Sequence, residues 1–153
     1  MFNQNDRIQD INNKQLTHSS KSYDMVDTNI SKNLKNSIYF DMASKVAKKS
    51  TMNQKHGCVI VYKNKVISTA CNTKIPAHKE SIHAEVSAII KLKNKRMQSV
   101  LPECELYVVR IGKSSMEYPL KYSKPCINCE NYIKLNRIRA AYYSVNDESV
   151  FMS

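Results

Sequence analysis

The sequence lacks any apolar run that approaches the roughly 18 residues needed to span a membrane. Its N-terminus, Met1–Asp6, is polar and has no apolar core, which argues against a secretory signal. Without such a signal, five cysteines favour a reducing, cytoplasmic location over a disulfide framework. We therefore expect an intracellular protein with no membrane partner. We also expect buried thiols at Cys58, Cys71 and Cys104, which lie in apolar runs.

Acidic residues are also scarce: the chain has 13 of them and 24 lysines and arginines, which gives a formal net charge of +11. An excess of positive charge suggests a nucleic-acid partner. A second interpretation is compositional. The chain is rich in lysine, asparagine and isoleucine, with two glycines and no tryptophan, which is also expected of an AT-rich genome. Lysine outnumbers arginine, although arginine is preferred for bidentate phosphate binding. Both interpretations remain open at this point.

The length suits one domain that can bury its own core. Residues 1–36 are polar, so we expect a disordered or loosely attached N-terminal tail, and a domain over residues 37–153. The pattern of apolar residues predicts helices over 37–49, over 84–93 and from Pro125 onward, and strands over 58–62, 66–71, 106–111 and 140–145, with a turn at Lys63–Asn64. This order indicates a three-layer α/β fold.

Two short strings contain the reactive side chains: His83-Ala84-Glu85, and a string from Pro125 to Cys129 whose first cysteine lies 43 residues after His83. Cys126 and Cys129 are three apart, so the first turn of a helix would place both sulfurs on one face. His83 stands at the start of another helix, and an alternation of strands and helices tends to collect helix N-termini at one edge of a sheet. One imidazole and two thiolates can bind one Zn²⁺ per chain. Three protein ligands leave a fourth position for water, as in catalytic zinc sites.

Glu85 lies two residues from His83, close to the predicted metal without being an obvious ligand. We assign it as the proton shuttle that takes a proton from zinc-activated water and delivers it to the substrate. The alternative is a closed zinc site that only stabilises the fold, which usually requires a fourth protein ligand. The available candidates, none with ligand-like spacing to the two strings, are His56, His78, Cys58, Cys71 and Cys104.

The two strings match His-x-Glu followed by Pro-Cys-x-x-Cys, the signature of zinc-dependent nucleobase deaminases. Over residues 37–146 the chain resembles the cytidine and deoxycytidylate deaminase superfamily, and Lys55–Val61 is similar to its first strand, entered through a glycine. The resemblance implies an α/β/α domain with a mixed sheet of four to five strands. It also implies that His83, Cys126 and Cys129 bind zinc and that Glu85 is the proton shuttle. By the same resemblance Asn72 would bind the sugar, although it could also be a turn residue, and the main-chain N–H of Ala84 would contact the base.

The C-terminal region departs from this family pattern, which usually includes a fifth strand. Only eight residues follow Val145, and a crossover to a parallel strand needs a dozen or more. We therefore expect at most a short antiparallel hairpin with Val150–Met152 at the edge. Because members of the family commonly assemble, the resemblance also implies a homo-oligomer.

Three functions are compatible with these residues. A compact domain favours a hydrolytic deaminase that converts a cytosine nucleoside or nucleotide to the uracil form and releases ammonia. The net charge favours an editing deaminase acting on tRNA or other RNA, or on single-stranded DNA. Lys124, however, stands where the tRNA adenosine branch would have glutamate, and a non-catalytic zinc module would not need Glu85. The polymer hypothesis depends on a basic and aromatic loop before the cysteine motif: Lys113, Tyr118, Lys121, Tyr122 and Lys124.

Overall fold

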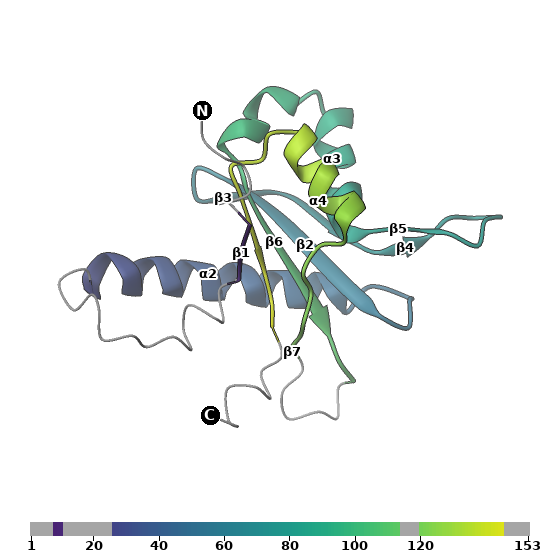
Figure 1. The fold of residues 1–153 in the computed structure, drawn as a ribbon, viewed down its shortest axis with the longest axis horizontal. Coiled ribbons are helices and arrows are strands. Elements are labelled where there is room, and N and C mark those ends of the chain that lie inside the picture. The colour runs from purple at the N-terminus through teal and green to yellow at the C-terminus, as the bar shows by residue number, and fades with distance from the viewer. Residues whose placement is uncertain (1–7, 11–25, 114–119, 146–153) are drawn as a thin grey trace.

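The computed structural model describes residues 8–10, 26–113 and 120–145 of the chain. Its main sheet has the strand order β1-β8-β6-β2-β3, and the short strand β7 also pairs with β6 (Figure 1). Strands β1, β8 and β6 are parallel, whereas β6, β2 and β3 are antiparallel neighbours. The strands are β1 (Ile8–Asp10), β2 (Lys55–Tyr62), β3 (Lys65–Cys71), β6 (Glu105–Ile111), β7 (Leu120–Lys121) and β8 (Ala140–Tyr143). The sheet is therefore mixed, as expected.

Helices cover both faces of the sheet and complete three layers (Figure 1). Helix α2 (Val26–Ala47) packs against one face. Helices α3 (Ala84–Asn94) and α4 (Ile127–Leu135) pack against the other, and a 3-10 helix over Gln98–Glu103 follows α3. The predicted α/β class is confirmed. None of the helices within the described ranges is long and apolar enough to cross a membrane.

Strand β2 shows why both faces need a cover. Cys58 and Ile60 are buried in the core beneath α3 and α4, while Val59 and Val61 are buried in the core beneath α2. Successive side chains of a strand point to opposite faces, so an unbroken apolar run marks a strand buried on both sides. Such a run gives a strong sequence signal, and β2 accordingly lies inside the sheet, between β6 and β3.

Gly57 permits the close approach of α2 to this central strand. A Cβ atom built at Gly57 would overlap the carbonyl oxygen of Ala43 and lie 2.5 Å from the backbone nitrogen of Ala47. Both contacts are with helix backbone, which cannot move aside as a flexible side chain could. The glycine at the entry to β2 is thus a packing requirement, and Ala43 and Ala47 are the small residues that match it.

Several elements differ from the prediction. Helix α2 begins at Val26 rather than at residue 37, and the predicted loop over 72–82 contains a two-stranded hairpin of β4 (Thr73–Lys74) and β5 (Ser81–Ile82). The predicted turn at Lys63–Asn64 is present, with φ of 46° and 63°, and joins β2 to β3. Two consecutive positive φ angles are typical of the tight turns that match strand twist.

The edge beside β8 is occupied by the N-terminal strand β1, which runs parallel to it. The predicted edge at Val150–Met152 lies outside the described residues, as do residues 1–7 and 11–25 of the predicted tail. Within residues 1–36, the structure contains β1 and the first part of α2. The boundary between a tail and the domain at residue 37 stays a prediction.

Candidate active site

Two helices begin at the predicted zinc ligands. His83 is the N-cap of α3, and its carbonyl oxygen accepts the N–H of Ser87 at 3.0 Å. Cys126 is the N-cap of α4, and Cys129 lies in the first turn of that helix. Pro125 therefore precedes the N-cap instead of opening the helix as predicted. Helix N-termini carry unpaired N–H groups and partial positive charge, which favour thiolates at this position.

The three ligand atoms have the spacing of a metal site. His83 Nδ1 lies 3.2 Å from Cys129 Sγ and 3.6 Å from Cys126 Sγ, and all three ligand atoms lie within 4.8 Å of one another. Zinc bonds of about 2.3 Å to sulfur and about 2.0 Å to nitrogen, at a tetrahedral angle, would separate these atoms by about 3.6 Å. The donor set therefore fits zinc. In the part of the chain that the structure describes, no further His, Cys, Asp or Glu joins the cluster.

Cys129 is buried, whereas Cys126 and His83 are exposed. Burial raises the pKa of Cys129 well above its usual range, and the charge of Glu85 raises it further. The metal-free thiol is therefore protonated near neutral pH. Metal binding requires the thiolate, so zinc uptake would release this proton and should weaken in acid.

Glu85 lies in the first turn of α3, is only 4% exposed and lines the same pocket as His83. Burial raises the pKa of its carboxyl group, while its own backbone N–H, His83 and the Cys129 thiol act in the opposite direction. A buried carboxyl group whose pKa is moved upward can both accept and return a proton more readily than a solvated one.

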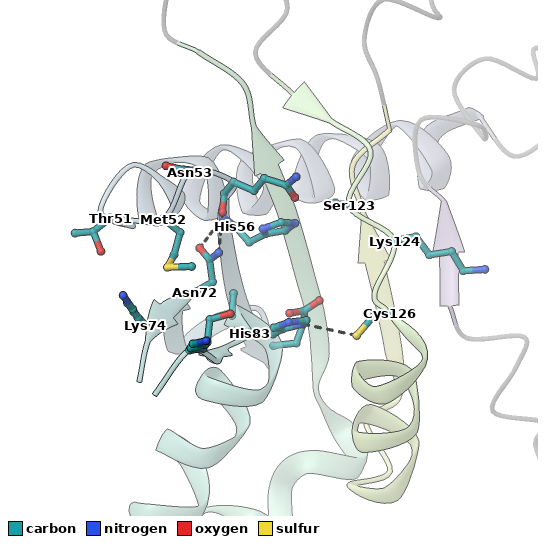
Figure 2. Close-up of a pocket in the computed structure, with 15 residues that line it drawn as sticks. Thr51, Met52, Asn53, His56, Asn72, Lys74, His83, Ser123, Lys124 and Cys126 are labelled. Atoms are coloured by element: carbon teal, nitrogen blue, oxygen red, sulfur yellow. Dashed lines mark hydrogen bonds between the residues drawn. The ribbon is translucent and has the colours of Figure 1, made fainter. Parts of the chain in front are cut away.

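A pocket of about 670 Å³ lies over this cluster (Figure 2). Its lining includes His83, Ala84, Glu85 and Cys126, together with residues 51–54 from the segment that follows α2. The volume is in the range of small-molecule sites. Ala84 is fully buried and is the first residue of α3, so its N–H has no partner within the helix.

Asn72 follows β3, and its side chain is largely occupied by the protein itself (Figure 2). Its Oδ1 accepts the backbone N–H of His56 at 2.9 Å and lies 2.7 Å from Ser50 Oγ, and its Nδ2 donates to the carbonyl of Gln54 at 2.7 Å. One N–H of the amide is left for a ligand. Asn72 thus holds the segment from Ser50 to His56 against the pocket, in addition to lining the pocket itself.

His56 and Ser123 also line the pocket; sequence reasoning considered His56 only as a candidate fourth zinc ligand and did not consider Ser123. His56 lies on the same face of β2 as Cys58 and Ile60, so the alternation of that strand could have placed it near the site. Burial is the main cause that lowers the pKa of His56. Ser123 gave no sequence signal; its Oγ donates to Val108 O at 3.0 Å or shares a bond with Ser144 Oγ at 2.8 Å.

The basic loop predicted to bind a polymer is only partly at the pocket. Lys124 lines the pocket, and its Nζ lies 3.7 Å from Glu130 Oε1. Lys113 is exposed and is not among the lining residues. Tyr118 lies outside the described residues. Lys121 belongs to β7, and Tyr122 is 48% exposed just after it.

Residues 34–145 match the cytidine and deoxycytidylate deaminase zinc-binding region, and the chain belongs to this family. Two solved structures share its fold. The dCMP deaminase from cyanophage S-TIM5 in its apo form has a TM-score of 0.56 and 19% identity, over 73% of this chain and 84% of that one. A cytidine deaminase from Burkholderia pseudomallei has a TM-score of 0.52 and 19% identity, over 66% of this chain and 76% of that one. No curated protein matches the chain.

Proposed function

We propose that this protein is a zinc-dependent hydrolytic deaminase that converts a cytosine nucleoside or nucleotide to the uracil form and releases ammonia. The observation that supports this most strongly is the buried carboxyl group of Glu85, which lines one pocket together with His83 and Cys126, two members of the cluster that Cys129 completes. Three ligands with tetrahedral spacing leave a coordination position open, which a purely structural zinc site would not. A buried carboxyl group in the same pocket is costly to the fold, because charged groups are costly to bury, and proton transfer gives it a purpose.

His83, Cys126 and Cys129 would hold the zinc ion, which, when bound, supplies a water molecule that is acidic near neutral pH. Glu85 would accept one proton of the attacking water, whose oxygen would form a bond to C4 of the cytosine ring. Glu85 would pass this proton to the ring nitrogen, then take the remaining proton of the new C4 hydroxyl group and give it to the amino group. The C4–N bond then breaks, ammonia leaves and a carbonyl group remains at C4. The N–H of Ala84 contacts the base, and the remaining N–H of Asn72 contacts the sugar.

Deamination of cytosine within RNA or single-stranded DNA is the second candidate. It is favoured by the net charge of +11 and by Lys124 and the exposed Tyr122, which directly precede the cysteine motif. Lysines that follow a backbone and aromatic rings that stack on bases are common features of single-strand binding. This candidate uses the same chemistry and differs in what surrounds the base.

The direct test is to incubate zinc-loaded protein with cytidine, deoxycytidine, their monophosphates, single-stranded DNA and tRNA, and to detect deamination by mass spectrometry. Glu85→Ala is the matched control for contaminating activity. We expect wild type, but not Glu85→Ala, to convert at least one substrate to a product whose mass corresponds to replacement of the amino group by oxygen. If fully zinc-loaded wild type deaminates none of the panel, the proposal is wrong. A polymer substrate would in addition bind with a steep dependence on salt.

A further inference from the structure

The β4–β5 hairpin, which the sequence did not predict, is built directly onto the proposed active site. It begins immediately after Asn72 and ends immediately before His83. From there it extends away from the sheet (Figure 1). The two residues that hold it in place therefore belong to the pocket, so the position of the hairpin relative to the zinc cluster is fixed at both ends.

The inner face of this hairpin presents cationic and hydroxyl groups to the pocket. Lys74 and Ser81 are directly paired across the two strands, and both line the pocket. Directly opposed residues of an antiparallel pair project from the same face, with Cβ atoms about 4.5–5.5 Å apart. Lys79, from the turn that connects the strands, also lines the pocket. Figure 2 shows Lys74 on the same side of the pocket as Asn72, and Lys124 on the opposite side.

Within the described ranges, neither Lys74 nor Lys79 forms an ion pair, whereas Lys124 lies 3.7 Å from Glu130. Glu80, the acidic residue of the hairpin, is not among the residues that line the pocket. The single acidic residue among those lining residues is Glu85, which is buried at the zinc cluster. The hairpin wall of the pocket therefore has a positive charge that an anionic ligand would balance.

We propose that the β4–β5 hairpin is a phosphate-binding arm, so that the substrate is a phosphorylated cytosine nucleotide rather than an uncharged nucleoside. This rests on the proposed function. The base would lie at Glu85 and the zinc cluster, and the phosphate would lie against Lys74, Lys79 and Ser81. Lysine binds phosphate as a point charge, and a serine hydroxyl can donate a further hydrogen bond to it. The phosphate monoester of a free nucleotide and the diester of a single strand share this chemistry.

The test compares kcat/KM for a cytosine nucleotide and for the matching nucleoside. The variant is Lys74→Gln with Lys79→Gln, and the control is Lys63→Gln with Lys65→Gln, which makes the same charge change in the β2–β3 turn outside the pocket lining. We expect the hairpin variant to lose about ten- to a hundredfold for the nucleotide. The kcat/KM of the hairpin variant for the nucleoside, and the kcat/KM of the control variant for both substrates, should be unchanged. Equal losses for both substrates, no loss, or a wild-type preference for the nucleoside would overturn the proposal.

A second measurement does not depend on turnover. Calorimetric binding of cytidine monophosphate and of cytidine to zinc-loaded Glu85→Ala should show tighter binding of the nucleotide, and this preference should disappear when the two hairpin lysines are also replaced. If wild type deaminates nothing but this preference is present, the proposed function fails and the phosphate arm stands. The same measurement with a short single-stranded oligonucleotide that contains one cytosine identifies the source of the phosphate. Replacement of the two hairpin lysines should weaken binding of the preferred form, nucleotide monoester or strand diester, by more than it weakens binding of the other form.

Discussion

The two faces of the sheet are packed by different kinds of side chain. Beneath α2 the core is aromatic: the ring of Tyr107 stacks on Tyr142 with centroids 4.9 Å apart and meets Tyr39 at 5.0 Å. Its polar atoms are satisfied locally, because Tyr107 Oη lies 2.8 Å from Asn36 Oδ1 and 2.9 Å from Glu105 Oε2. No residue of this core lines the pocket.

The opposite face is mainly aliphatic, with Tyr143 as its buried aromatic residue, and uses small residues where α3 crosses the sheet. Ala84 and Ala88 are fully buried there, next to Ile89 and Leu92. Small side chains let the helix lie close to the strands, and its N-terminus reaches the pocket with His83 and Glu85. The same strands support both faces, but the reactive groups gather at one end of one face. Stability and chemistry should therefore respond to different substitutions.

The largest expected effect is on the reactive end. Cys126→Ser removes one of three ligands, so we expect zinc to fall from one per chain to a trace and deamination to be lost. Metal analysis of purified protein measures this. Cys71→Ser is the matched control, because Cys71 is only partly buried and lies outside the cluster, and it should keep its zinc. Full zinc content in Cys126→Ser would show that the cluster is not the metal site.

The next effect separates metal binding from proton transfer. Glu85→Gln keeps the size of the side chain but cannot move a proton, so we expect kcat to fall by about 10²–10⁴ while zinc stays at one per chain. Glu103→Gln, an exposed acid in the 3-10 helix, should change neither quantity. If Glu85→Gln lost its zinc, the carboxylate would be a metal ligand and our assignment as a shuttle would be wrong.

Gly57→Ala tests the other face. Its new methyl group would overlap the backbone of α2 at Ala43 and Ala47, so we expect the free energy of unfolding to fall by about 1–3 kcal/mol or more. Urea denaturation measures the change. An unaltered midpoint with an unaltered slope would mean that α2 does not approach β2 as closely as the structure shows.

The sequence predicted the parts of this molecule that local spacing determines. Cys126 and Cys129 lie about one helical turn apart, and His83 and Glu85 lie two residues apart at the start of one helix. Strand β2 was predicted from its unbroken apolar run at Cys58–Tyr62. Each of these signals lies within a few residues of sequence. The structure brings the histidine string and the cysteine string together where the N-termini of α3 and α4 meet.

Features that depend on distant contacts could not be predicted in this way. Strand β1 pairs with β8 although the two are more than a hundred residues apart in sequence, and three residues carry too little pattern to indicate a strand. The β4–β5 hairpin has two-residue strands in a polar segment. The hydrogen bonds of Asn72 reach residues 16 to 22 positions away, so its role in holding Ser50 and His56 was visible only in the folded chain.

The smallest expected effect is a difference in how the two faces respond to pH. Burial raises the pKa of Tyr142, in the aromatic core, to about 12, from about 10 in the unfolded chain. The unfolded state therefore ionises first, and stability present below about pH 10 should be lost as the pH rises towards 12. Burial lowers the pKa of His56 below its unfolded value of about 6.5, so stability present above that pH should be lost in acid.

Chemical denaturation of the metal-free protein across pH measures both limbs of this profile. Tyr142→Phe should reduce the alkaline loss of stability, to which the buried Tyr107 and Cys104 also contribute, and should leave the acidic limb unchanged. His56→Gln should reduce the acidic loss and leave the alkaline limb unchanged, because the two groups titrate in different pH ranges. Use of the metal-free protein separates these limbs from the pH dependence of zinc uptake by Cys129. If either substitution altered both limbs, the two faces would be coupled, and the separation of stability from chemistry would not hold.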